Sequence, residues 1–174
     1  MNNKSKLLLV LLAALILFYF VYVEHAFDTV SFEKGMEKIK GLDKEFTGDY
    51  LIPLQSEELK EYNIGLTNLE KEFSEKNQNN DAKALILLVK TRKELVLMQL
   101  KLIEVQEAVS CQGQVEAMDS VISSAESARN SIQEYADKYS SFAEKTTEWN
   151  ENVLDTTSSV ILSFRELKDE KGSC

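Results

Sequence analysis

Residues 82–110 read AKALILLVKTRKELVLMQLKLIEVQEAVS, and this stretch predicts the central helix of a helical bundle. Two apolar stripes run along it at helical spacing, on different faces of the predicted helix. The first stripe comprises Ala84, Leu88, Leu95, Met98, Leu102, Val105 and Val109, and the second comprises Leu85, Val89, Val96, Leu100 and Ile103. A helix that is apolar on two faces must contact neighbours on both. Lys90, Glu94 and Lys101 interrupt the stretch, so it is not expected to cross a membrane.

Two neighbouring helices are predicted before this stretch, over residues 27–46 and 56–76. Gly35 and Gly41 weaken the first of them, each by roughly 0.5–1 kcal/mol relative to alanine. Residues 47–53, TGDYLIP, form the clearest helix breaker in the chain. Ser56 is expected to cap the second helix, and Asp81 is expected to cap the central one.

A further helical pattern follows the central helix. Cys111–Gln114 is predicted to be a turn, with Gly113 in a positive-φ conformation. Helices joined by short loops lie antiparallel. A straight helix would therefore carry an acidic segment past the N-terminal end of the bundle. We expect a break between Thr146 and Asp155, with 156–170 running back; the alternative is an unbroken rod over 114–170.

The beginning of the chain predicts a membrane anchor. Residues 7–23 are an unbroken apolar run, LLLVLLAALILFYFVYV, about 25 Å long as a helix. Lys4 and Lys6 precede it, which favours a cytoplasmic N-terminus. The alternative is a cleavable signal peptide, whose apolar core is normally only about 7–15 residues long. The length of the run favours an uncleaved signal anchor.

The expected organisation is therefore an all-α chain of the cell membrane. An N-terminal transmembrane helix is followed by an antiparallel, coiled-coil-like bundle of four to five helices. Residues 1–6 are expected in the cytoplasm and 7–23 in the bilayer, where they contact membrane lipid. The bundle over 24–170 is expected to be extracytoplasmic, and residues 171–174 to form a flexible tail.

Composition excludes several classes of function. The chain of 174 residues has a net charge of −9, which argues against nucleic acid as a partner, because phosphate contacts need clustered Lys and Arg. Its single histidine, His25, excludes metal sites that need two imidazoles. No nucleophile elbow, phosphate-binding loop or dinucleotide fingerprint is present. We therefore expect no enzyme activity, no cofactor and no metal site.

The two cysteines, Cys111 and Cys174, form a candidate disulfide. On the exported side of a membrane they could pair and fasten the last helix to the bundle. The open alternatives are two independent thiols or a bridge between chains, because sequence alone does not fix connectivity.

A candidate polar seam lies between the two apolar stripes of the central helix. Arg92, Gln99 and Gln106 recur every seven residues. In the next helical pattern, Arg129 occupies a heptad position whose other members are mostly apolar. A structural interpretation is that Arg92 and Arg129 pair with carboxylates of neighbouring helices and fix their register. A functional interpretation is a polar slot in which Arg92 holds a carboxylate or phosphate. Polar heptad positions are best attested in the structural role, which we favour.

An aromatic group is predicted near the membrane end of the bundle, where we interpret its members as core residues. The group consists of Tyr135, Tyr139, Phe142 and Trp149. The alternative is a small-molecule pocket between the helices.

Two functional hypotheses follow. The first is a non-enzymatic interaction or scaffold module of the cell envelope, with a protein partner or a second copy of the chain. The second is an extracytoplasmic ligand-sensing bundle. Only about six residues precede the apolar run, so a sensor would have to signal through a separate membrane partner.

Overall fold

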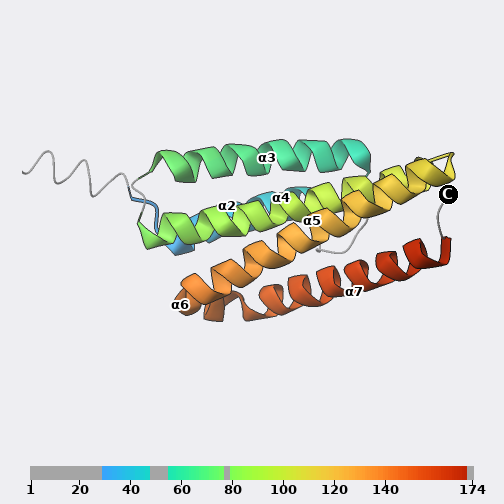
Figure 1. Cartoon of the computed structure of the whole chain (residues 1–174). Coiled ribbons are helices and arrows are strands. Elements are labelled where there is room, and N and C mark those ends of the chain that lie inside the picture. The colour runs from blue at the N-terminus through green and yellow to red at the C-terminus, as the bar shows by residue number, and fades with distance from the viewer. Residues whose placement is uncertain (1–28, 48–54, 77–78, 172–174) are drawn as a thin grey trace, which may run out of the picture.

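The computed structural model describes residues 29–47, 55–76 and 79–171, and this part of the chain contains helices and no strands. Five long helices lie lengthwise in the bundle, and successive long helices run in opposite directions (Figure 1). They are α2 (Phe32–Thr47), α3 (Ser56–Glu75), α4 (Asn80–Glu107), α5 (Cys111–Lys138) and α7 (Thr147–Lys171). A short helix α6 (Ser140–Ala143) and a 3₁₀ turn η1 (Glu144–Thr146) join α5 to α7. The expectation of an all-α bundle of four to five helices is confirmed for these residues.

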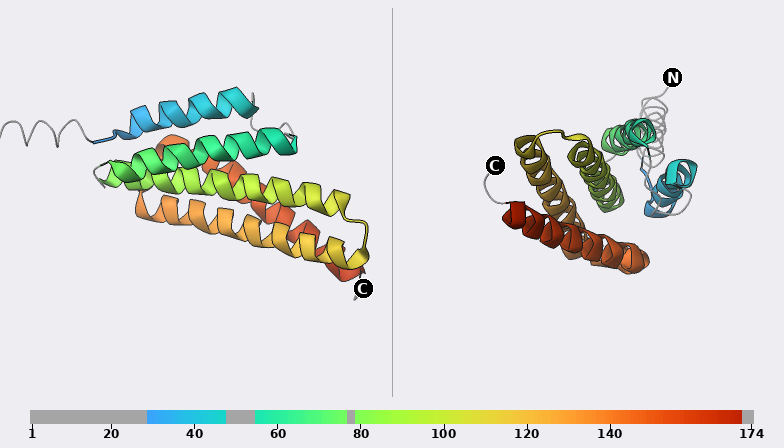
Figure 2. Two further views of the ribbon diagram at one scale, coloured as in Figure 1. Left: turned by 90° about the horizontal axis from the view of Figure 1, so that it is seen from above. Right: turned by 90° about the vertical axis from the view of Figure 1, so that its right-hand side faces the viewer.

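Helix α4 occupies the centre, as its two apolar faces predict. It packs against α2 and α3 on one side and against α5 on the other (Figure 2). Its residues Ala84, Leu85, Leu88 and Val89 are fully buried. The main core gathers around the half of α4 that contains them, and a smaller core of Met98, Val121, Ala125 and Ile161 joins α4, α5 and α7 farther along.

The two ends of the bundle differ in which chain segments they hold. At one end, here called the proximal end, the Phe32 backbone N–H donates to Asp81 Oδ2 at 2.8 Å, and Lys145 pairs with Glu33 at 2.5 Å. The start of α2, the start of α4 and η1 therefore meet there. The opposite, distal end holds the α4–α5 turn, Ala108–Ser110, and the end of α7 (Figure 1).

The last helix does fold back along α5, but the predicted position of the break is wrong. The chain reverses over 139–146, and α7 is one continuous helix from Thr147 onward, across the rest of the Thr146–Asp155 segment in which we expected the break. Arg165–Glu126 and Lys168–Asp119 ion pairs, at 2.7 and 2.5 Å, show that α5 and α7 are antiparallel. The unbroken rod over 114–170 is also excluded.

Side-chain hydrogen bonds and packing explain the early reversal. Tyr139 leaves the helical region, at φ −131° and ψ 47°, and ends α5. The Asn150 amide then donates to the Ala143 carbonyl at 3.2 Å, and Thr146 donates to Asn150 Oδ1 at the same distance. With Asn150 and Val153 buried, tertiary contacts hold in a helix a segment whose intrinsic helix propensity is weak.

The predicted helix starts also need correction. Gln55, not Ser56, caps α3 in a reciprocal pair with Glu58. Asn79 caps α4, since its side chain accepts from the Ala82 N–H at 2.8 Å, whereas Asp81 is bonded to α2. These polar residues lie within two positions of one another, and local sequence does not decide between them.

The predicted Cys111–Gln114 turn is likewise wrong. These residues form the first turn of α5, in which Ser110 Oγ accepts from the Gly113 N–H at 3.1 Å. Gly113 is therefore helical, and the connection between α4 and α5 is Ala108–Ser110.

Within the described residues, no helix has the length and apolar character needed to cross a bilayer. The predicted anchor over 7–23 lies outside these residues, as do 1–6 and 172–174.

Candidate functional site

A buried ion pair lies at the point where α2 and α4 meet. Arg92 Nε is 3.2 Å from both carboxylate oxygens of Asp43, and Arg92 Nη2 is 3.1 Å from Asp43 Oδ2. Only 4% and 5% of the two side chains are exposed. The guanidinium also donates to the Leu88 carbonyl at 3.3 Å, within its own helix. This forked arrangement fixes the orientation as well as the charge of Arg92.

Two aromatic side chains bring α3 and α7 to the same cluster. The Tyr62 hydroxyl on α3 donates to Asp43 Oδ1 at 2.5 Å, and Tyr62 is buried. On α7, the ring centroid of Trp149 lies 4.1 Å from the Arg92 guanidinium carbon, which is a cation–π contact. We call Asp43, Tyr62, Arg92 and Trp149 the Arg92 cluster. Its members come from four different helices.

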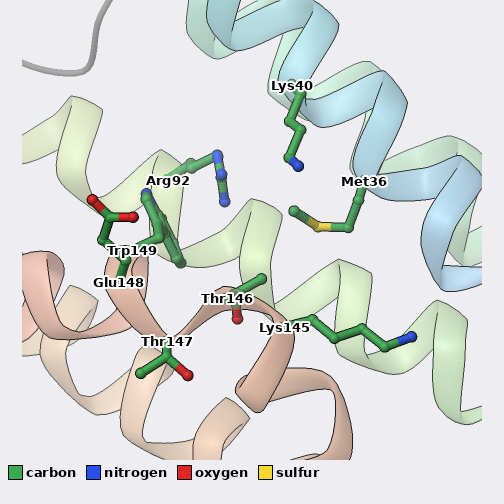
Figure 3. A pocket seen from close by; sticks show the side chains of 8 residues that line it. All are labelled: Met36, Lys40, Arg92, Lys145, Thr146, Thr147, Glu148 and Trp149. Carbon is green, nitrogen blue, oxygen red and sulfur yellow. The ribbon is translucent and has the colours of Figure 1, made fainter.

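A pocket of about 210 Å³ opens beside the cluster, between α2 and the segment that begins α7 (Figure 3). Its floor includes Arg92 and Trp149. The other lining residues are Met36 and Lys40 from α2, Lys145 and Thr146 from η1, and Thr147 and Glu148 from α7. The early reversal of the chain places the α7 residues here.

A second polar group lies behind η1, inside the bundle. The Tyr135 and Thr146 hydroxyls are 3.1 Å apart, and both residues are buried. Burial raises the pKa of Tyr135, against smaller lowering effects of the hydrogen bond to Thr146 and the charge of Arg92. The Tyr135 hydroxyl thus remains neutral and serves as a hydrogen-bonding group.

The predicted seam residues lie in different surroundings. Arg92 is buried, Gln99 and Arg129 are partly buried, and Gln106 is exposed. No hydrogen bond or ion pair among the described residues joins Arg92 to the other three. The Arg129 Nε atom is buried without a hydrogen-bond partner in this part of the chain. The structure thus places Arg92 alone of these four in the cluster.

The predicted aromatic residues lie at or near the proximal end. Phe142 stacks on Phe32, with ring centroids 4.4 Å apart, and Tyr135 and Tyr139 have centroids 6.4 Å apart. Phe32 and Tyr135 are almost fully buried. Trp149 has a different role from the other predicted aromatic residues, because it covers Arg92 and lines the pocket.

Neither Asp43 nor Tyr62 was expected in a candidate site from the sequence. A signal for Asp43 was present: Met36, Ile39 and Phe46 follow helical spacing, and Asp43 occupies the remaining position of that stripe. A carboxylate on the buried face of a helix requires a cationic or hydrogen-bonding partner. Arg92 is such a cation, because it lies on a buried face of the predicted helix over 82–110.

Cys111, at the first position of α5, is disulfide-bonded. The other cysteine of the chain, Cys174, lies outside the described residues. Their pairing with each other stays a prediction.

The arrangement is suited to binding and to holding helices together. Among the described residues, no three His, Cys, Asp or Glu side chains gather as a metal site would require. Comparison with protein-family models, with curated proteins and with solved structures finds no match to this chain. The function must therefore be inferred from the chain itself.

Proposed function

We propose that this chain is a single-pass membrane protein whose helical bundle acts as a non-enzymatic interaction or scaffold module of the cell envelope. The observation that supports the proposal is the Arg92 cluster. Its two charged and two aromatic side chains join four helices to one another. We infer that a bidentate pair buried this deeply holds these helices in register.

The place where the chain enters the bundle is consistent with a tether. Residues 29–31 lead into α2 at the proximal end, so a span over 7–23 would attach the bundle by that end. Helix α4, with 28 residues, makes the bundle about 42 Å long at about 1.5 Å per residue. The distal turn would then project away from the bilayer, and it presents Val109, which is fully exposed.

The tether is tested by carbonate extraction of membranes that contain the full chain. We expect the full chain to stay with the lipid and a variant that lacks residues 7–23 to be released. Mature protein that begins near Phe27 and is recovered in the soluble fraction would overturn the tether.

The interaction role is tested separately, by the mass of the full chain purified in detergent and by photo-crosslinking from position 109. A defined homo-oligomer or a single crosslinked product supports the proposal. A monomer that gives no crosslinked product contradicts it. A crosslinker at the exposed residue Ser159, in the middle of α7, serves as the control position.

A second candidate is a ligand-sensing bundle that signals through a separate membrane partner. The pocket beside Trp149 favours it, because this pocket lies between α2, the first described helix after the predicted anchor, and the segment that begins α7. A ligand that contacts both elements could alter their relative positions.

A further inference from the structure

The pocket between α2 and η1 differs in charge from the rest of the chain. Its lining includes three cationic side chains, Lys40, Arg92 and Lys145, and one acidic side chain, Glu148. The whole chain has a net charge of −9. Asp43 and Glu33 pair with Arg92 and Lys145, but neither of these acids lines the pocket. A concave site in which cationic side chains outnumber acidic ones favours ligands of negative charge.

Lys40 is the cation best placed to contact a ligand. It is exposed, and no carboxylate of the described residues forms an ion pair with it. Figure 3 shows its side chain extending from α2 into the space beside Arg92 and Met36. Arg92 also lines the pocket, but its charge is balanced by Asp43 and its guanidinium lies against Trp149, so Lys40 is the cation that a ligand can pair with.

The remaining walls offer an apolar surface. Met36 and the Trp149 indole line the pocket, and methionine adapts to varied ligand shapes. The volume of about 210 Å³ is smaller than the roughly 300–1,000 Å³ of pockets for drug-sized molecules. The site therefore suits a small molecule that combines one negative group with a compact apolar body.

We propose that this pocket binds a small organic monocarboxylate. Its carboxylate contacts the Lys40 ammonium, and its apolar body lies against Met36 and Trp149. The inference names the ligand class for the second candidate function and rests on that candidate. It does not depend on the membrane tether.

The single tryptophan of the chain makes a direct test practicable, because Trp149 lines the pocket. The full chain is titrated with phenylacetate, in nanodiscs of zwitterionic lipid where it stays with lipid and in buffer where it does not, and the intrinsic fluorescence is recorded. We expect a saturable change with phenylacetate and none with phenylacetamide, its neutral analogue.

The matched variants are Lys40→Gln and Lys44→Gln. Lys44 is exposed one turn farther along α2 and does not line the pocket. We expect Lys40→Gln to weaken phenylacetate binding at least fivefold and Lys44→Gln to leave it unchanged. Both variants remove one surface charge, so a difference between them reports on the pocket.

Three outcomes would overturn the proposal. They are the absence of a saturable change, an equal response to the amide, and equal binding by the Lys40→Gln variant. Saturable binding of inorganic phosphate without binding of phenylacetate would also overturn it and would indicate a site for inorganic anions. Failure of the carbonate-extraction test would leave these outcomes unaffected.

Discussion

Arg92 and Asp43 are both buried, and the contribution of each to stability therefore depends on the other. An isolated charge at this depth would cost several kcal/mol, so each side chain is tolerated only because the other is present. Tyr62 adds a charge-assisted hydrogen bond to the same carboxylate. At this scale the cluster acts as one unit, and removing one member leaves the others unsatisfied.

We therefore predict strong coupling between Arg92 and Asp43. Arg92→Met alone should lower the free energy of unfolding by about 3–5 kcal/mol, because it leaves a buried carboxylate without its cation. Arg92→Met combined with Asp43→Leu should cost less than the two single changes added together. Urea unfolding followed by circular dichroism measures all three variants.

An exposed ion pair provides the control for this comparison of single and double variants. Lys38 and Glu72 form an ion pair between α2 and α3, with 49% and 38% of their side chains exposed. Lys38→Met should change stability by about 0–1 kcal/mol, as is usual for exposed pairs. Additive effects of the Arg92 and Asp43 substitutions would refute the role that we assign to the cluster.

The packing of α2 against α4 depends on a glycine. A Cβ atom on Gly35 would overlap the side chain of Leu85, whose Cδ2 atom would be only 2.7 Å away. Leu85 is fully buried, so moving its side chain aside would displace its neighbours in the core. Gly41, six residues farther along the same helix, has nothing within 4 Å of the corresponding position. The two glycines that weaken α2 equally on sequence grounds thus have different structural roles.

Alanine substitutions at these two positions should have opposite effects. Gly35→Ala should destabilise the bundle by about 1–3 kcal/mol, because it overpacks the α2–α4 contact. Gly41→Ala should stabilise it by roughly 0.5–1 kcal/mol, because alanine is the better helix former and the site is open. Thermal unfolding of both variants tests the pair, and stabilisation by Gly35→Ala would contradict the close approach of α2 and α4.

At the scale of the whole molecule, stability depends on how α7 is attached to the rest of the bundle. It packs chiefly on α5, and near its end it is joined to α5 by the exposed ion pairs of Arg165 and Lys168. The Lys168–Asp119 pair brings the end of α7 beside the first turns of α5, where Cys111 lies. Helix α7 ends at Lys171, and Cys174 follows three positions later, which allows a reach of about 10 Å towards the start of α5 at about 3.3–3.6 Å per residue.

We predict that Cys111 and Cys174 form an intramolecular disulfide. Peptide mapping without reductant should recover the two cysteines in one crosslinked fragment of a monomeric chain. Reduction should lower the stability of the bundle by about 2–4 kcal/mol, because the bond restricts the unfolded chain. Labelling of both thiols without prior reduction, or a reductant-sensitive dimer, would contradict this pairing.

The predicted disulfide also gives a test of the side of the membrane on which the bundle lies. Structural disulfides persist in oxidising compartments, so a confirmed pairing would support the proposed extracytoplasmic side for the bundle. Reactivity of Cys174 only after permeabilisation of intact, reduced cells would contradict that side.

The sequence by itself determined the helices and the central place of α4, because helical periodicity is a local property that each stretch of chain carries. The two stripes of 82–110 require neighbours on both faces whatever the rest of the fold may be. The heptad spacing of Arg92 also singled it out, and the residue does lie in the candidate site.

Only the tertiary structure decided the partners of these local features. The pairing of Arg92 with Asp43, the cover provided by Trp149 and the reversal at Tyr139 all depend on contacts between segments far apart in the chain. Residues Thr146–Asp155 are weak helix formers, yet they are helical from Thr147 onward because Asn150 and Val153 are buried there. Packing energy outweighed local propensity at that point, and that choice placed the pocket where it is.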